Sequence, residues 1–218
     1  MFVGHYGAAY FAKGAEKRVP LGILFVAVQL VDILWAIFIL TGVERVRIVP
    51  GTTAANPLDF TYFPYTHGLT GVLAWSVLAA FAYWIWRRRD GVVPALWVGA
   101  AVLSHWPLDL LVHAHDLPLF GNSFKVGFGL WNHPMDAVLA EALALLLGLW
   151  YYLWRTKPVG PAGRYGVVVF TAILLAVQLA NAFGPPPTSV HTVAVAGLLA
   201  YFLFALIAWR LDRARVVE

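Results

Sequence analysis

The stretch Leu103–Asp116, which reads Leu-Ser-His-Trp-Pro-Leu-Asp-Leu-Leu-Val-His-Ala-His-Asp, decides how this chain is interpreted. It closes an apolar run that begins near Val92, so a helix is expected. His105, Asp109 and His113 follow one another at four-residue steps, and residues four apart share one face of a helix. The stretch therefore predicts a polar stripe on an otherwise apolar helix.

Pro107 lies inside this stripe and predicts a local distortion of the helix. Proline has no N–H, so the carbonyl of Leu103 loses its usual donor and a kink is expected. Ionisable groups cost free energy in an apolar or lipid setting, and they persist where they have partners or a function. A free carbonyl beside a His and an Asp is therefore a candidate place for an ion or a water.

The composition of the chain indicates a membrane protein. Of its 218 residues, 61% are hydrophobic and 12% are charged, and the mean hydropathy is +0.75. Soluble domains are nearer half apolar and a quarter charged. The net charge of +4 is then no sign of nucleic-acid binding, which we do not expect. The chain has no cysteine, which excludes disulfides and leaves His, Asp, Glu, carbonyls and water for any metal site.

Six apolar segments come near the ~20 residues that a bilayer core requires. We therefore expect an all-α fold, a single integral membrane domain over residues 1–218 with six transmembrane helices. The expected spans are residues 19–41, 65–86, 92–113, 133–154, 165–183 and 190–209.

The positive charges sort to one side of these spans. Twelve of the fifteen Lys and Arg residues lie on one side of the spans. They lie before span one, between spans two and three, between spans four and five, and after span six. Only Arg45, Arg47 and Lys125 fall on the other side. By the positive-inside rule we expect both termini in the cytoplasm. The expected location is the plasma membrane, the inner membrane of a bacterium.

Two outward connections are long, and each has its own character. Residues 42–64 contain turn signals such as Pro50-Gly51 and Asn56-Pro57. Residues 114–132 are rich in glycine and aromatic side chains, which suits a lid or an interfacial segment.

With this topology, ionisable side chains gather in the outer half of the membrane. Their depth follows from the rise of ~1.5 Å per helical residue. Random placement would scatter such groups over both leaflets, so their convergence indicates a site that faces outward. The groups expected there are Asp32, His67, His105, Asp109, His113, His133, Asp136, Glu141 and His191.

The residue types in this half favour a metal. Zinc binds His nitrogen and carboxylate oxygen, and a catalytic zinc keeps one position open for water. His105 and Asp109 supply two ligands from one face, and His67, Asp32 and His113 are candidates to complete the set. We expect a divalent metal, with zinc favoured and a second ion left open.

Acid–base roles are expected for residues of the fourth span. Water bound to such a metal loses a proton near neutrality, and a nearby side chain then acts as general base or acid. The candidates are His133, Glu141 and Asp136. Alternatively, Asp136 only stabilises the positive end of its helix, and His113 is only an interfacial side chain.

The motifs resemble those of a known family. Ser104-His105-Trp106-Pro107-Leu108-Asp109 resembles the Ser-His-x-x-x-Asp signature of the YdjM-like membrane-bound metal-dependent hydrolases. Tyr65-Thr66-His67-Gly68 resembles that family's Thr-His-Ser element, and Gly4-His5-Tyr6-Gly7 its N-terminal His. Asp32 falls where the family has Pro-Asp-x-Asp. The resemblance covers roughly residues 1–116 and implies metal binding, with His5 as a further ligand.

This chain departs from the family pattern at two places. The Pro-Asp-x-Asp segment is Leu30-Val31-Asp32-Ile33, with one acid and no proline, which weakens an assignment of two metals. His5 precedes the basic group Lys13–Arg18 on the expected cytoplasmic side. It reaches the other candidates only if residues 1–12 re-enter the membrane as a short apolar helix.

Three functions are weighed on these observations. The first is a metal-dependent hydrolase that acts at the outer face on a lipid or an amphiphilic ester or phosphoester. The second is a transporter or channel for protons or metal ions, which needs polar groups through both leaflets. The third is a non-catalytic subunit that binds haem or a partner, with His105 and His67 as axial ligands. The scarcity of polar groups in the inner half favours the hydrolase.

Overall fold

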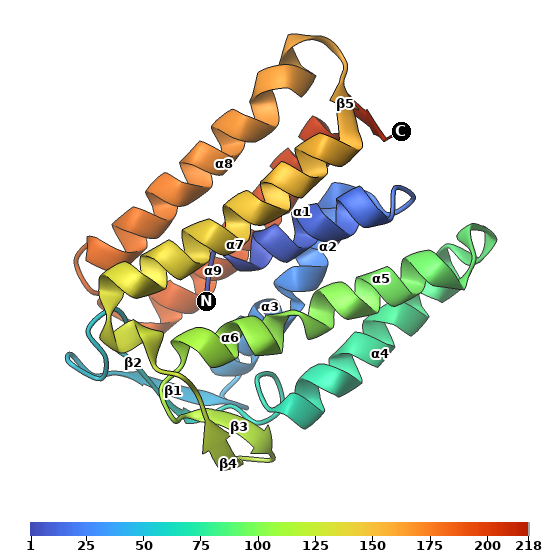
Figure 1. Ribbon diagram of the computed structural model, residues 1–218. Helices are drawn as coiled ribbons and strands as arrows, with labels where there is room; N and C mark the ends of the chain where they lie inside the picture. Colours follow the sequence, from blue (N-terminus) through green and yellow to red (C-terminus); the bar gives the residue numbers. More distant parts are fainter. Residues whose placement is uncertain (218) are drawn as a thin grey trace.

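The computed structural model describes residues 1–217 and is mostly helical, which confirms the expected fold class (Figure 1). The α-helices are α1 (His5–Ala15), α2 (Leu21–Val28), α3 (Leu30–Leu40), α4 (Leu69–Trp86), α5 (Val92–Leu103), α6 (His105–Val112), α7 (Pro134–Arg155), α8 (Gly160–Phe183) and α9 (Val190–Asp212). Short strands pair antiparallel: β1 (Arg45–Ile48) with β2 (Leu58–Tyr62), β3 (Leu117–Phe120) with β4 (Ser123–Val126), and β5 (Thr156–Pro158) with β6 (Arg215–Val217).

Within residues 1–217, five helices or continuous helix pairs are long and apolar enough to cross a membrane: α4, α5 with α6, α7, α8 and α9. A sixth candidate is the pair α2 and α3, which is bent by 52°. These elements follow the six predicted segments closely. The predicted distortion at Pro107 is present, because the helix is interrupted at Ser104 between α5 and α6.

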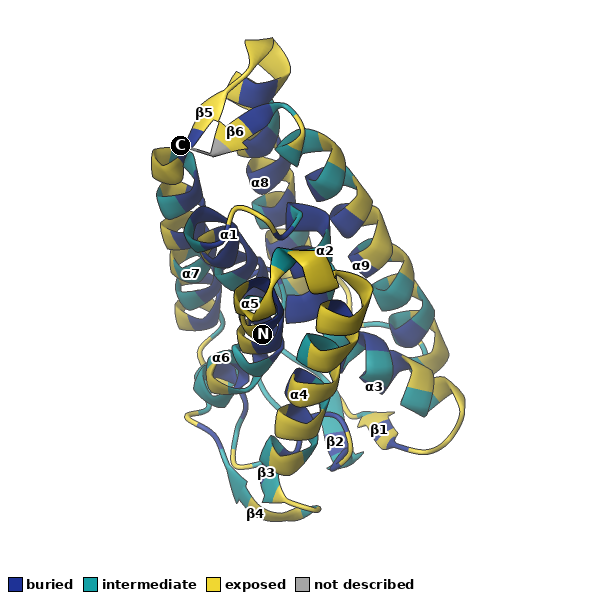
Figure 2. Cartoon of the chain, turned by 90° about the vertical axis from the view of Figure 1, so that its right-hand side faces the viewer, coloured by how far each residue is buried: buried dark blue, intermediate teal, exposed yellow. Residues whose placement is uncertain are grey.

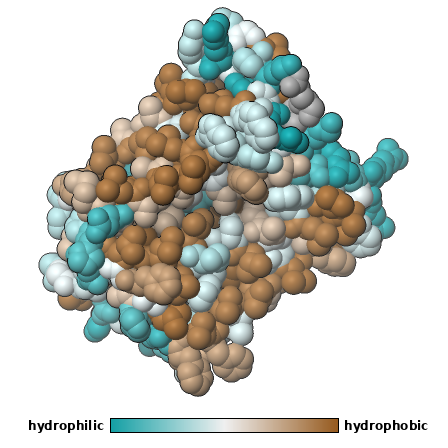
Figure 3. Space-filling model, viewed as in Figure 1, coloured by the Kyte–Doolittle hydropathy of each residue, from teal (hydrophilic) through white to brown (hydrophobic). Residues whose placement is uncertain are grey.

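Apolar side chains cover much of the outer surface of this bundle (Figure 3). On a soluble protein such side chains would face the core, whereas here they point outward, as expected of a surface in contact with lipid. Large side chains that are about half exposed or more include Val77, Phe81, Leu139, Leu143, Leu147, Val169, Ile173, Leu199, Phe202 and Leu206.

Helix α1 fills the middle of the bundle. It packs mainly against α7 and α2, and most of its residues are buried (Figure 2). Close approach to α7 depends on small residues, as in other helix contacts inside membranes. A Cβ placed on Gly7 would lie 2.1 Å from the Ala144 carbonyl oxygen, and one on Gly148 would lie 2.0 Å from the Gly7 carbonyl oxygen. Helix α1 thus places His5 inside the bundle, where it is fully buried.

The two long connections contain strands that were not predicted. β1–β2 and β3–β4 lie at the same end of the bundle, while β5–β6 lies at the opposite end (Figure 1). Short ladders satisfy backbone N–H and C=O groups that would otherwise lack partners near the membrane. The alternation of apolar and polar residues in these segments is too short to predict strands.

Candidate metal centre

Four side chains form a closed ring of alternating nitrogen and oxygen atoms. His67 Nε2 lies 3.2 Å from Asp32 Oδ1 and 3.6 Å from Asp109 Oδ2. His105 Nε2 lies 3.7 Å from Asp32 Oδ1 and 3.2 Å from Asp109 Oδ2. Two ligands at about 2.0–2.2 Å from one tetrahedral zinc ion are roughly 3.3–3.6 Å apart. The four edges of the ring, 3.2–3.7 Å, lie close to this range, so a metal ion between these side chains is geometrically possible.

The local structure explains how this ring forms. Asp32 lies in the first turn of α3, just after the bend at Gln29. His105 and Asp109 are four residues apart on α6 and face the same way, as the sequence predicted. His67 precedes α4 in a turn where its N–H donates to the Phe63 carbonyl.

The imidazole nitrogens that face away from the centre of the site are hydrogen-bonded to acceptors. His105 Nδ1 lies 2.8 Å from the carbonyl oxygen of Val28, the last residue of α2. His113 Nδ1 lies 3.0 Å from Asp116 Oδ1. A carbonyl or carboxylate oxygen can only accept, so each Nδ1 carries a proton, and in the neutral imidazole each Nε2 presents the lone pair. This orientation by an outer acceptor is typical of metal-binding histidines.

His67 has the same orientation through a hydroxyl group. Its Nδ1 lies 2.9 Å from Thr66 Oγ1, and that hydroxyl donates to Glu44 Oε2 at 2.6 Å. A threonine hydroxyl has one proton, so Oγ1 must accept from His67 Nδ1. His67 Nε2 therefore also presents a lone pair to the ring.

Lone pairs that face carboxylates repel them unless a cation lies between them. Asp109 is 2% exposed at its side chain and Asp32 is 13% exposed, so water screens this repulsion little. His105 Nε2 has no hydrogen-bond partner although it is buried. Two buried carboxylates require compensating positive charge, of which the Met1 ammonium group beside Asp109 Oδ1 supplies a part. The residues present therefore fit a divalent metal ion, as the sequence led us to expect.

His5 lies beside this ring, on the other oxygen of Asp109. Its Nε2 is 3.2 Å from Asp109 Oδ1, and its ring stacks on His105 with centroids 3.9 Å apart. The Met1 nitrogen contacts the same Oδ1. Two sets of three residues are close enough to hold a metal ion, and both contain His105. They are His5, His105 and Asp109, and Asp32, His67 and His105.

The remaining expected residues divide into two groups. His113 lies 3.7 Å from Asp109 Oδ2 and lines a cavity next to the ring. Glu141 lines this cavity as well, but Oε2 accepts from the Phe2 and Gly4 N–H groups and Oε1 from Gln178 Nε2. It thereby anchors the segment before α1, while Oε1 keeps an acceptor site beyond the one hydrogen bond from Gln178.

His133 and Asp136 are not brought to the ring. Both are exposed at the beginning of α7, and neither lines the cavity. His133 is the residue before the helix and Asp136 lies in its first turn. A carboxylate there is favoured by the helix dipole, which was the alternative interpretation.

The cavity beside the ring measures about 660 Å³ and is mostly apolar. Asp32, His67, Asp109 and His113 line one side, and residues 50–58 of the β1–β2 connection line its outer end. Small side chains of α8 and α9 line another part of it. They are Ala180, Ala182, Ala196, Gly197 and Ala200. Clefts of this size and composition are typical of small-molecule sites.

Glu44 and Asp116 were missed as partners of the site. Asp116 had a signal, since it follows His113 by three residues at a helix end. Glu44 had none, because a Glu in a turn is ordinary, yet its side chain is buried at 1% exposure. Burial raises the pKa of Glu44 above its ordinary value, and the hydrogen bonds that it accepts from Thr66 and Tyr65 oppose this rise.

Comparison with protein-family models, with curated proteins and with solved structures finds no match to this chain. The resemblance to the YdjM-like family therefore rests on the motif residues alone.

Proposed function

We propose that this chain is a metal-dependent hydrolase of the plasma membrane that uses zinc to cleave a lipid or another amphiphilic ester or phosphoester. The observation that carries the proposal is the ring of His67, His105, Asp32 and Asp109, with edges of 3.2–3.7 Å. Its nitrogen lone pairs and two carboxylates suit a divalent cation at a buried position beside a cavity.

In this proposal the four ring residues hold the metal. When bound there, zinc would supply a nucleophilic water at neutral pH and polarise the substrate oxygen. Asp116 keeps the proton of His113 on Nδ1, so His113 Nε2 is free to accept a hydrogen bond from a water in the cavity. His113 would thereby orient the attacking water, whereas from the sequence we expected His133, Glu141 and Asp136 in the acid–base roles.

The cavity supports a substrate with an apolar chain. Alanine and glycine residues of α8 and α9 supply part of its apolar wall, although polar side chains such as Glu141, Gln178 and Asn181 line it as well. Ala180 and Ala196 of this wall are exposed, so the two helices leave the cavity accessible between them. A chain that enters from the membrane would bury apolar surface there, which stabilises binding by about 25 cal/mol per Å².

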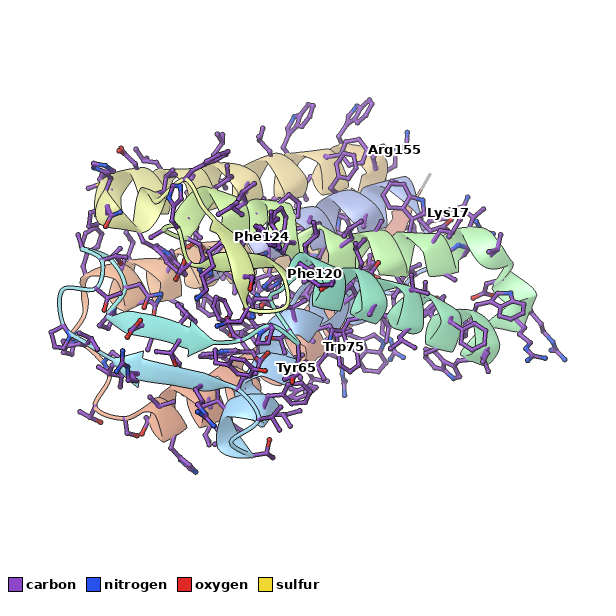
Figure 4. All side chains as sticks on the ribbon, turned by 90° about the horizontal axis from the view of Figure 1, so that it is seen from below. Lys17, Tyr65, Trp75, Phe120, Phe124 and Arg155 are labelled. Carbon is purple, nitrogen blue, oxygen red and sulfur yellow. The ribbon has the colours of Figure 1, made fainter. Side chains whose placement is uncertain are left out.

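We propose that the cavity opens on the outer side of the membrane. Residues 50–58 line one end of it, next to the β1–β2 hairpin. Basic residues gather at the other end, where Lys17 and Arg155 lie (Figure 4). The positive-inside rule assigns that end to the cytoplasm.

The geometry gives less support to a haem subunit. The rings of His67 and His105 have centroids 5.4 Å apart, with Asp32 and Asp109 within 3.7 Å of both Nε2 atoms. A flat porphyrin between these two histidines would displace both carboxylates. A Soret band in the purified protein would favour haem over the hydrolase.

Elemental analysis of the purified protein tests the proposal first. We expect one or two equivalents of zinc, manganese or iron in the wild type, and loss of this metal in His105→Ala and Asp109→Ala. His191→Ala is the matched control, since His191 is exposed and lies outside the cavity lining. Hydrolysis of fluorogenic long-chain esters and phosphoesters should follow the metal content. Full metal content and full activity in both variants would overturn the proposal.

A further inference from the structure

We propose that Glu44 is a positioning residue of the metal centre, which acts through Thr66 to hold the Nδ1–H of His67 and so direct its Nε2 atom toward the ring. This inference rests on the proposed metal centre and deepens it. Glu44 lies in a connection that carries no metal-binding motif, and it touches neither the ring nor the cavity.

The turn after α3 places this carboxylate. Gly42 has a positive φ of 76°, and the N–H groups of Val43 and Glu44 both donate to the Phe38 carbonyl. Such a left-handed glycine ends a helix and reverses the chain. Glu44 is thereby buried beside the turn that precedes α4, although it is distant from His67 in sequence.

Both oxygens of Glu44 accept hydrogen bonds from the turn that contains Thr66. Oε1 accepts from the N–H groups of Tyr65 and Thr66 at 2.8 and 3.0 Å. Oε2 accepts from the Thr66 hydroxyl at 2.6 Å. Because Oε1 faces two N–H donors, the atom at this position must be an acceptor. In a Gln side chain the amide oxygen, and not the NH₂ group, would therefore occupy it.

The direction of these bonds determines the tautomer of His67. The Thr66 proton goes to Glu44, so Thr66 Oγ1 takes the proton of His67 Nδ1 at 2.9 Å. The lone pair of Nε2 then points toward Asp32 and Asp109, 3.2 and 3.6 Å away. A proton on Nε2 would instead donate to Asp32 and prevent ligation.

Replacement of Glu44 by Gln should reverse this chain of hydrogen bonds. The amide oxygen must take the Oε1 position to accept the two backbone N–H groups, so the amide NH₂ faces Thr66. Thr66 then accepts from Gln and donates to His67 Nδ1, which moves the imidazole proton to Nε2. The substitution is nearly isosteric, so the shape of the turn is retained.

The first measurement is metal affinity by competition with a chromophoric chelator. We expect zinc affinity to fall roughly 10–100-fold in Glu44→Gln, as for other outer partners of metal-binding histidines. Asp59→Asn is the matched control, because this carboxylate pairs with exposed Arg47 in the β1–β2 hairpin away from the ring. Wild-type affinity in Glu44→Gln, with zinc bound by the wild type, would overturn the inference.

The second measurement is the ¹⁵N spectrum of the imidazoles in the metal-free protein, with the His67 signals assigned by their absence in His67→Asn. We expect the proton on Nδ1 in the wild type and on Nε2 in Glu44→Gln. A proton on Nε2 with none on Nδ1 in the wild type would refute the role of Glu44 even if the variant failed to fold. If the wild type binds no metal, the proposed function fails, while this spectrum still decides the role of Glu44.

Discussion

Substitution of Gly7 by alanine should separate α1 from α7. The added Cβ would lie 2.1 Å from the Ala144 carbonyl oxygen and 2.5 Å from its carbon. That is 1.3 Å short of the 3.4 Å at which ordinary contact begins. The obstructing atoms belong to the backbone of α7, so no side chain can rotate away. One helix must move by about 1 Å, and His5 lies only two residues from the substituted position.

Two opposing terms set the size of this effect. Alanine is favoured over glycine inside a helix by about 1 kcal/mol. Overpacking of a close contact costs about 1–3 kcal/mol. Because backbone atoms cannot yield, we take the upper part of this range, and we expect a net loss of about 2 kcal/mol. Displacement of α1 should also draw His5 away from Asp109 and the stacked His105 ring.

Reversible unfolding in detergent micelles, followed by tryptophan fluorescence, measures this loss. Gly197→Ala is the control, because its Cβ would meet only the Tyr201 ring, at 3.3–3.5 Å. We expect this control to be neutral or slightly more stable, since the propensity gain remains. If Gly7→Ala were as stable as Gly197→Ala, the close packing of α1 on α7 would be wrong.

Three further predictions concern the site. Before chelation, let free metal be present at 100–1,000 times its Kd; removal of the metal should then lower the free energy of unfolding by about 2.7–4.1 kcal/mol. Thermal denaturation measures this difference, and Asp32→Asn should abolish it. His133→Ala and Asp136→Ala should keep wild-type metal content and activity, because both residues are exposed and distant from the cavity; loss of metal in either, measured by elemental analysis, would contradict this assignment. Ala196→Phe should reduce turnover of long-chain substrates more than of short-chain ones, at unchanged metal content, because it fills the apolar wall of the cavity; equal effects on both in a chain-length series would argue against an acyl site there.

The sequence predicted those features that depend on local periodicity or on bulk composition. The spans follow from runs of apolar residues, and the four-residue spacing put His105 and Asp109 on one face of α6. The broken helix at Pro107 also followed from the chemistry of proline. The carbonyl that meets His105, however, belongs to Val28 and not to Leu103, since the bend between α2 and α3 brings a distant backbone group closer.

Features that depend on contacts between distant segments were not predictable. Glu44 meets Thr66 only because Gly42 reverses the chain after α3. Glu141 was a reasonable acid–base candidate at the depth of Asp32, yet its oxygens bind the backbone N–H groups of Phe2 and Gly4. No periodicity encodes such partners, because each depends on which helix packs beside which.

The position of α1 bears on the choice between an enzyme and an ion path. Between the ring and the basic end of the bundle, α1 contributes Tyr6 and Tyr10, both fully buried. Tyr6 stacks on Phe25 with centroids 4.4 Å apart, and Tyr10 stacks on Tyr152 at 5.6 Å.

An ion that left the ring toward the basic end would have to cross this aromatic packing before it met the next carboxylate, Asp212, to which the Tyr152 hydroxyl donates. Such a crossing is costly in a low dielectric. The cavity, by contrast, reaches the ring from the hairpin end. Access from one side suits a substrate that enters, reacts and leaves by the same route. Zinc or proton flux into liposomes that is lost in Asp32→Asn would require α1 to move, and it would reverse the preference for a hydrolase.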